Sequence, residues 1–252
     1  MNKIFKIIIV ALLFVTVGSV KADDTRLKQA ADLYTAQSYE EAAGVYADIL
    51  KTKVVSPELY YNYANACYKS GQLGLAILNY ERALVLRPNY EDARFNLDFA
   101  NAQISDKIEP IEPFFLTQWI EAVGSFQTTK QWAITSIVTF IVGLILILLY
   151  VFASHRWLRK LGFFGALICL GLSVASMAYS FSSKNRAEDR STAIVMVGAL
   201  PVKSAPDESG TELFVLHEGT KVTIKSKLRG WLEIRIADGH VGWIKANQIE
   251  RI

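Results

Sequence analysis

The sequence contains few of the side chains that commonly carry out catalysis or bind metals. It has only 3 histidines and 2 cysteines among 252 residues. His155, His217 and His240 lie in different parts of the chain, and no Cys/His spacing is typical of a zinc site. A glycine-rich phosphate loop and a nucleophile elbow are also missing. The sequence therefore predicts a protein that is not an enzyme and that holds no metal or cofactor.

Neither sign of charge is in large excess, with 27 basic and 24 acidic residues. The formal net charge is +3, which is too small to indicate a nucleic-acid partner, and we predict none. Cys67 falls in a predicted helix and Cys169 lies within a long apolar run, so we expect two separate, buried structural thiols. The apolar fraction of 52% is above the usual range of soluble proteins, which points to membrane segments.

The N-terminus has the pattern of a secretory signal peptide. Lys3 and Lys6 precede the apolar run Ile7–Val17, and a small residue, Ala22, follows. A basic start, a short apolar core and a small residue at the end predict a signal peptide over residues 1–22. An uncleaved anchor is the alternative interpretation. Under either interpretation, the segment that follows is exported.

Two further apolar runs have the length of transmembrane helices. Residues 132–152 and 161–181 are uncharged, and a helix of about 20 residues crosses the hydrocarbon core of a bilayer. The connecting segment 153–160 is basic, and such loops stay cytoplasmic. Its basic residues are Arg156, Arg159 and Lys160.

The two topology signals agree with each other. An exported N-terminal part and a cytoplasmic loop both place the segments before and after the hairpin in the periplasm, with the hairpin in the inner membrane. Neither span contains an ionisable side chain of the kind that ion and proton pathways use. We therefore expect the spans to be anchors and not a transport path.

The exported N-terminal part repeats itself with a period of 34 residues. Identical residues at this spacing are Ala30 and Ala64, Tyr34 and Tyr68, Ala42 and Ala76, and Tyr46 and Tyr80. A period of 34 is typical of tetratricopeptide repeats, in which each unit forms two antiparallel helices. We predict units over 23–56 and 57–90 and a single closing helix over 91–104. Pro110 and Pro113 exclude a regular second helix in a third unit.

The second unit resembles the tetratricopeptide family most closely, with Tyr60, Tyr63 and Ala64 in its first helix and Gly71 at the turn. The resemblance implies that the first helices of the units line a groove that holds an extended protein segment. The groove positions that it carries over are Glu58, Tyr61, Asn62, Asn65, Tyr68, Lys69 and Asn96.

Asn65 and Asn96 match two asparagines of the family's carboxylate clamp, but Leu27 stands where the clamp has a lysine. The resemblance therefore does not support a clamp. An alternative interpretation is that the asparagines satisfy backbone groups between helices. Because about three repeats are needed for independent stability, we expect this short array to rest on another element or on a partner.

The segment 105–131 is a membrane-proximal linker that contains an apolar helical pattern. Large apolar residues recur at helical spacing between Phe114 and Phe126. Two interpretations remain open. The helix lies in the membrane interface ahead of the first span, or it packs against the repeats as their support.

The pattern changes to alternation in the C-terminal part. Residues 222–224 and 232–236 alternate apolar and polar side chains, and a turn at Gly239 follows. Short strands within about 60 residues predict a small all-β barrel over 192–252, after a linker over 182–191.

This segment resembles the bacterial SH3 family. The resemblance rests on Val202–Pro206, on Trp231 and on the closing Gly239–Ile244. It implies binding of cell-wall material or of another protein, with Trp231 and Trp243 as candidate ligand contacts. The alternative is that both tryptophans only pack within the barrel.

The order of the parts makes this a multidomain membrane protein, with an all-α tetratricopeptide array, a two-helix transmembrane hairpin and an SH3-like barrel. That order resembles the E-component family of Bacteroides aerotolerance operons. The resemblance implies a non-enzymatic cell-envelope scaffold that works with von Willebrand A-domain membrane proteins and a MoxR-type ATPase. The alternative hypothesis is a sensor that binds the cell wall (peptidoglycan) through the barrel.

Overall fold

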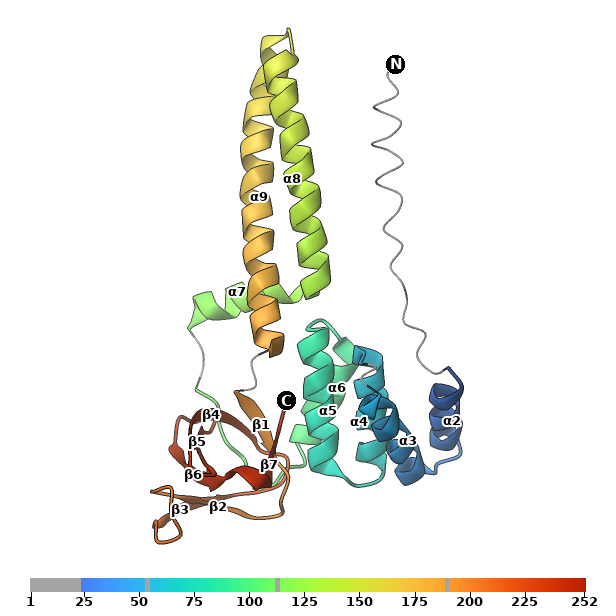
Figure 1. Cartoon of the computed structure of the whole chain (residues 1–252), viewed down its shortest axis with the longest axis vertical. Helices are drawn as coiled ribbons and strands as arrows, with labels where there is room; N and C mark the ends of the chain where they lie inside the picture. Colours follow the sequence, from blue (N-terminus) through green and yellow to red (C-terminus); the bar gives the residue numbers. More distant parts are fainter. Residues whose placement is uncertain (1–23, 53–54, 112–113, 189–190) are drawn as a thin grey trace.

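The computed structural model of the chain describes residues 24–52, 55–111, 114–188 and 191–252. The predicted signal peptide lies outside these residues. Figure 1 shows three parts: a helical array, a long two-helix hairpin, and a β domain that lies beside the array at the same end of the hairpin.

The array consists of two helical pairs and one further helix. Its helices are α2 (Asp24–Thr35), α3 (Tyr39–Lys51), α4 (Pro57–Lys69), α5 (Leu73–Leu86) and α6 (Glu91–Asn101). Ser56 caps α4, since its hydroxyl accepts a hydrogen bond of 3.1 Å from the N–H of Leu59. Gly71, with a φ of +82°, makes the turn between α4 and α5. Helix α6 ends before the predicted boundary at residue 104.

Small residues at the helix contacts form the core of the array. The alanines with no exposed surface are Ala30, Ala42, Ala64, Ala66, Ala76, Ala83, Ala93 and Ala100. They let the helices approach closely, and Tyr46 and Tyr80 fill the space between them. Cys67 is buried in this core, whereas Cys169 is half-buried in the hairpin, and both are free thiols.

The hairpin packs through small residues. Helices α8 (Thr129–Phe152) and α9 (Arg156–Glu188) are both long and apolar enough to cross a membrane. The hydroxyls of Ser136 and Ser173 each donate to the other residue's carbonyl oxygen at 2.9 Å. A Cβ atom at Gly162 would lie 2.7 Å from the backbone nitrogen of Tyr150, so glycine is needed there. Such contacts are typical of helix pairs in membranes.

The hairpin helices are longer than predicted. Helix α9 begins at Arg156, so the predicted loop 153–160 is reduced to Ala153–His155. Arginine and lysine are good helix formers, and their long side chains reach beyond the apolar part of a helix, so the basic residues begin α9. Helix α9 also runs to Glu188 through most of the predicted linker 182–191, which has no glycine or proline before that residue.

The β domain contains seven short antiparallel strands. They are β1 (Thr192–Val195), β2 (Leu200–Lys203), β3 (Glu212–Leu216), β4 (Lys221–Leu228), β5 (Trp231–Arg235), β6 (Val241–Lys245) and β7 (Ile249–Arg251). Their order is β3-β2-β6-β5-β4-β1-β7. In the described part of the chain, the predicted SH3-like domain thus appears as one antiparallel sheet, in which no hydrogen-bonded pair joins the end strands β3 and β7. The outer edge of β7 faces the array, where the Arg82 guanidinium donates to the Arg251 carbonyl oxygen at 2.5 Å.

Strand β1 contributes to two hydrophobic cores. Its side chains alternate between faces, as in any strand. Ala193 and Val195 lie in the core of the β domain, whereas Ile194 is fully buried in the core of the array. Met196 and Ile252 pack against the array on the same side. The β domain therefore covers the side of α5 that no second helix of a third unit covers.

The segment after α6 adds polar contacts to this junction. The Asp106 carboxylate accepts hydrogen bonds from the backbone N–H of His217 at 2.7 Å and from the Thr220 hydroxyl at 2.6 Å. Its other oxygen lies 2.6 Å from the Nδ1 atom of His217. Further along, the Ile111 N–H donates to the Ala237 carbonyl oxygen at 3.1 Å. Residues 106–111, between α6 and α7 (Phe115–Ser125), thus contact the β domain at both ends of this stretch.

The array therefore rests mainly on the β domain. We expected the segment 105–131 or a partner as its support, and that segment serves only through its first residues, up to Ile111. Helix α7 is not part of the core of the array. The hypothesis that α7 packs against the repeats was wrong because β1 already covers the open side of α5.

Shortening Ile194 to alanine tests the shared strand. Removing a fully buried isoleucine side chain leaves a cavity, so Ile194→Ala should lower the free energy of unfolding of the array by about 2–4 kcal/mol. Urea titration of the full-length protein in detergent, followed by circular dichroism, measures the change. Val241→Ala, at a half-exposed position of β6, is the matched control and should change it by less than about 0.5 kcal/mol. Equal effects of the two variants would contradict the shared core.

The Asp106 carboxylate makes the junction depend on pH. Burial raises the pKa of Asp106, but the hydrogen bonds from Thr220 and His217 outweigh burial and lower it below its ordinary value of 3.8. A carboxylate whose pKa is lower in the folded state than in the unfolded state stabilises the fold at pH values above its unfolded pKa. This stabilisation is lost as the pH falls through the folded pKa. Asp106→Asn should therefore cost about 2 kcal/mol at pH 7, and the difference from wild type should shrink below pH 3.8.

Urea titrations of wild type and Asp106→Asn between pH 7 and pH 3 give this difference at each pH. Asp98→Asn, at an exposed position of α6, is the control and should follow the wild-type profile. A difference between wild type and Asp106→Asn that stays constant with pH would show that the charge of Asp106 contributes nothing.

Candidate functional site: the concave face of the repeat array

The first helices of the units, α2, α4 and α6, line a pocket of about 350 Å³. The lining residues are Tyr34, Tyr61, Asn65, Tyr68, Lys69, Tyr80, Phe95, Asn96 and Phe99. The four from α4 follow one another at helical spacing, which places them on one face of the helix. We call this pocket the groove.

Two asparagines form a polar network at the base of the groove. The Asn65 side-chain oxygen accepts hydrogen bonds from the Tyr80 hydroxyl at 2.6 Å and from the Asn96 amide nitrogen at 2.9 Å. Asn96 also donates to the Tyr61 hydroxyl at 3.3 Å. Within the described segments, these asparagines thus bond other side chains. Their partners between the helices are thus side chains, where the alternative interpretation expected backbone groups.

The network leaves groups that face the groove. An asparagine side chain offers two donor hydrogens and one acceptor oxygen. The Asn65 amino group and the Asn96 oxygen have no partner among the residues that the structure describes. Burial raises the pKa of the Tyr80 hydroxyl far above its ordinary value, so this group stays protonated and keeps donating to Asn65. A ligand backbone can therefore find both a donor and an acceptor here.

Aromatic rings form the wall of the groove on α6. Phe95 is 72% exposed and Phe99 is 56% exposed, one helical turn further along. The ring of Tyr68 packs edge-on against Phe99 at a centroid distance of 6.0 Å. Exposed aromatic rings beside a pocket commonly mark a binding surface.

The structure brings five of the seven predicted groove residues together. Tyr61, Asn65, Tyr68, Lys69 and Asn96 all line the groove. Their role in binding stays a prediction.

Two predicted residues lie elsewhere. Glu58 forms an ion pair with Arg87 and is not part of the groove lining. Asn62 is exposed but also outside the lining, because it is turned about 100° from Tyr61 around the helix axis. Leu27, at the clamp's lysine position, packs against the array core, and the clamp therefore stays unsupported.

The sequence prediction missed Tyr34, Tyr80, Phe95 and Phe99. The repeat period itself held the signal for three of them. Adding 34 to Tyr61 and Asn65 gives Phe95 and Phe99, and subtracting 34 from Tyr68 gives Tyr34. The fourth, Tyr80, lies on α5 and has no counterpart at this spacing among the predicted groove residues.

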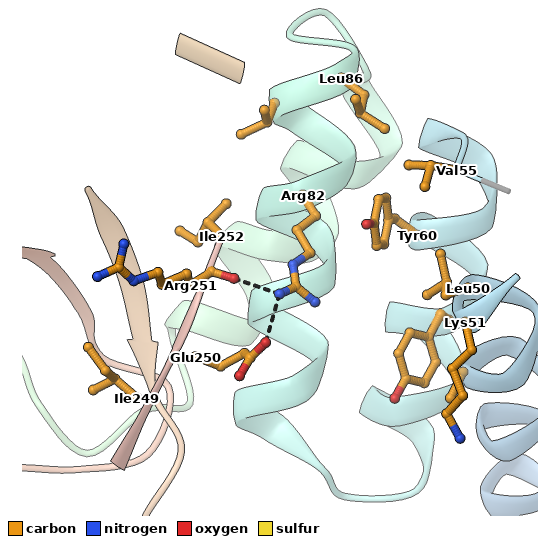
Figure 2. A pocket seen from close by; sticks show the side chains of 13 residues that line it. Leu50, Lys51, Val55, Tyr60, Arg82, Leu86, Ile249, Glu250, Arg251 and Ile252 are labelled. Carbon is orange, nitrogen blue, oxygen red and sulfur yellow. Dashed lines mark hydrogen bonds and ion pairs between the residues drawn. The ribbon is translucent and has the colours of Figure 1, made fainter. Parts of the chain in front are cut away.

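A second, wider cleft of about 890 Å³ lies where the array meets the C-terminal strand (Figure 2). Arg82 reaches across it and donates to the Arg251 carbonyl oxygen at 2.5 Å and to the Glu250 carboxylate at 3.1 Å. The Tyr60 ring lies 6.0 Å from the same guanidinium. The Arg82 guanidinium in this cleft is already bonded to the β domain. We therefore regard this cleft as part of the junction and the groove as the better candidate site.

The two candidate tryptophans of the β domain are both half-buried. The ammonium groups of Lys203 and Lys245 each lie 5.9 Å from the centroid of the Trp231 ring. Glu208 forms ion pairs with both lysines, at 3.7 Å and 2.6 Å. Trp231 is thus held in a polar setting at the surface and does not belong to the buried core.

The described residues do not bring three His, Cys, Asp or Glu side chains together in a way that suits a metal ion. Asp106 and His217 are in contact, and Thr220 is close by. The Thr220 hydroxyl, however, donates to Asp106 and not to His217, so these residues do not form the chain of nucleophile and base that hydrolases use.

Comparison with known families supports two of the three parts. A family model for the TPR repeat matches residues 64–104, and one for the bacterial SH3 domain matches residues 198–249. Both are non-catalytic domains, and both suggest protein-binding roles. A search of curated proteins finds no match to the chain.

Replacing Asn65 tests the polar network. Asn65→Ala removes the acceptor of the buried Tyr80 hydroxyl, and an unsatisfied buried group should lower the free energy of unfolding by about 1–3 kcal/mol. Asn62→Ala, on the same helix but exposed, is the matched control and should have little effect. Urea titration with circular dichroism compares the two. Equal stabilities would show that the network contributes nothing to the fold.

Proposed function

We propose that the chain is a non-enzymatic, membrane-anchored scaffold of the cell envelope, and that its groove holds an extended segment of a partner protein. The observation that carries this proposal is the groove itself. It combines exposed rings at Phe95 and Phe99 with amide groups of Asn65 and Asn96 that have capacity left for hydrogen bonds. The match to the TPR repeat model supports a protein as the ligand.

The groove lining defines the chemistry of the bound segment. Phe95 and Phe99 offer apolar surface to apolar side chains, while the asparagines offer a donor and an acceptor to the main chain of an extended peptide. Lys69 is exposed at the edge of the lining and favours a carboxylate nearby. The proposed ligand is therefore an extended segment with apolar side chains and an acidic group at one end.

The proposed location is the inner membrane, with α8 and α9 as its two spans. The basic residues at the start of α9 favour a cytoplasmic turn of the hairpin, and this leaves the array and the β domain in the periplasm. The contacts between Asp106 and His217 support one shared side, because these residues come from before and after the hairpin. The Ser136–Ser173 and Gly162 contacts support a membrane hairpin.

The proposed partners are cell-envelope membrane proteins. The domain order resembles an aerotolerance-type complex, which implies partners of the von Willebrand A-domain type. Anchoring beside such partners would raise the effective concentration of the groove for a segment that projects from the membrane.

Removing the aromatic wall tests the proposal. Phe95→Ala/Phe99→Ala should keep the fold, because both rings are exposed. It should lower partner recovery about thirtyfold, since each ring is worth roughly 1 kcal/mol in an interface. The measurement is cross-linked purification from native membranes with quantitative mass spectrometry. Val55→Ala, in the second cleft, is the matched control and should leave recovery unchanged.

The same experiment separates the alternative function. The half-buried Trp231 ring lies at the surface of the β domain, beside the Lys203 and Lys245 ammonium groups that Glu208 pairs, and a surface ring of this kind favours a peptidoglycan-binding sensor as the second candidate. Recovery of cell-wall fragments, with no protein that depends on Phe95 and Phe99, would sink the scaffold proposal and support the sensor.

A further inference from the structure

Helix α7 presents a large apolar surface that no described part of the chain covers. It lies across the base of the hairpin, beside the end of α9 (Figure 1). Phe115 is 65% exposed and Trp119 is 69% exposed. The other large apolar residues exposed in and next to the helix are Phe114, Leu116, Ile120 and Phe126. A soluble surface rarely carries so many large apolar residues together without a partner.

The apolar residues lie on one side of α7. Helical spacing places Phe115, Trp119 and Ile120 on this side, while Thr117 and Ser125 lie on the opposite one. The hydroxyls of these two donate within the helix, Thr117 to the Phe114 carbonyl at 2.6 Å and Ser125 to the Ala122 carbonyl at 2.8 Å. The helix is therefore amphipathic along its whole length.

The C-terminal end of α7 is held against the hairpin by a hydrogen bond and ring packing. The indole N–H of Trp132 donates to the Gly124 carbonyl oxygen at 3.0 Å. The same indole stacks on the ring of Tyr179 at a centroid distance of 4.9 Å. A Cβ atom at Gly124 would lie 3.4 Å from this tyrosine ring. Tryptophan and tyrosine near the ends of spans typically lie at the membrane–water interface.

We propose that α7 lies in the membrane–water interface and buries its apolar side in the lipid. This inference rests on the proposed membrane position of α8 and α9. Only Phe126–Thr128 separate α7 from α8, so α7 must stay within a few residues' reach of the interface. The bilayer next to the hairpin is the apolar surface closest to the exposed side chains, and helices with one apolar side bind there.

The array does not cover the apolar side of α7. The contact between them is polar, with the Asn89 side-chain amide 3.5 Å from the Phe126 carbonyl oxygen. Helix α5 of the array also contacts α9. Together with α7 in the interface, these contacts would keep the array near the membrane surface.

Spin-label accessibility of the full-length protein tests the proposal. Cys67 and Cys169 are replaced by alanine, and nitroxides are placed one at a time at Phe115, Leu116 and Trp119 on the apolar side and at Thr117 and Ser125 on the opposite side. The protein is reconstituted in vesicles of phosphatidylethanolamine and phosphatidylglycerol. Collision rates with oxygen, which concentrates in lipid, and with a water-soluble nickel complex are then measured.

The apolar-side labels should show oxygen collision rates several-fold above their nickel rates, at a shallow depth, and the opposite side should show the reverse. Nickel access on both sides would overturn the proposal in favour of a free helix. Protection from both reagents would overturn it in favour of a protein partner. A label at Leu148 in α8 checks the premise, because nickel access there would contradict the proposed span itself.

A charge on the apolar side provides a second measurement. Trp119→Asp/Ile120→Asp should lower the ratio of oxygen to nickel collisions at a Leu116 label several-fold, because the charged side leaves the lipid. Thr117→Asp, on the opposite side, is the matched control and should leave that ratio unchanged. An unchanged ratio in the double variant would also count against the interfacial position.

Discussion

The array and the β domain both depend on strand β1, which is buried on both of its faces. Ala193 and Val195 complete the core of the β domain, and Ile194 between them completes the core of the array. A short repeat array leaves one apolar side open, and such a side must be covered for the array to be stable. Here the cover comes from the other end of the chain, which makes the two domains one structural unit.

This constraint explains the order of the parts. The array precedes the hairpin and β1 follows it, so both must emerge on the same side of the hairpin for Ile194 to reach its place. Polar contacts add to the apolar contact of Ile194 at the junction. They join Asp106 to His217 and Thr220, and Arg82 to Glu250. The groove shares no lining residue with the cleft at the junction, so the residues that join the domains differ from those that we propose to bind a partner.

Much of the fold was predictable because it follows from local patterns. The 34-residue period placed the helix pairs of the array, and the uncharged runs placed the two long helices. Boundaries were less predictable where nothing breaks a helix, as at Arg156 and Glu188. The turn at Arg229–Gly230 was missed because an arginine with positive φ has no clear signal in a sequence.

Contacts between distant segments were the least predictable. Alternation along β1 indicates two faces but not that the second face meets a helix far away in the sequence, and nothing marks Asp106 as a partner of His217. The groove was predicted in part, because Tyr61, Asn65 and Tyr68 share one helix face. Its aromatic wall at Phe95 and Phe99 was missed because the repeat places different residue types, Tyr61 and Asn65, at the corresponding positions of the second unit.

The most direct test of the shared strand is hydrogen exchange of the full-length protein compared with a chain that ends at Glu188, both in detergent micelles. Because β1 completes the core of the array, removing the β domain should lower the protection of amides in α5 and α6 by orders of magnitude, while α8 and α9 keep theirs. Unchanged protection of α5 and α6 would contradict it, because the array would then be stable without β1.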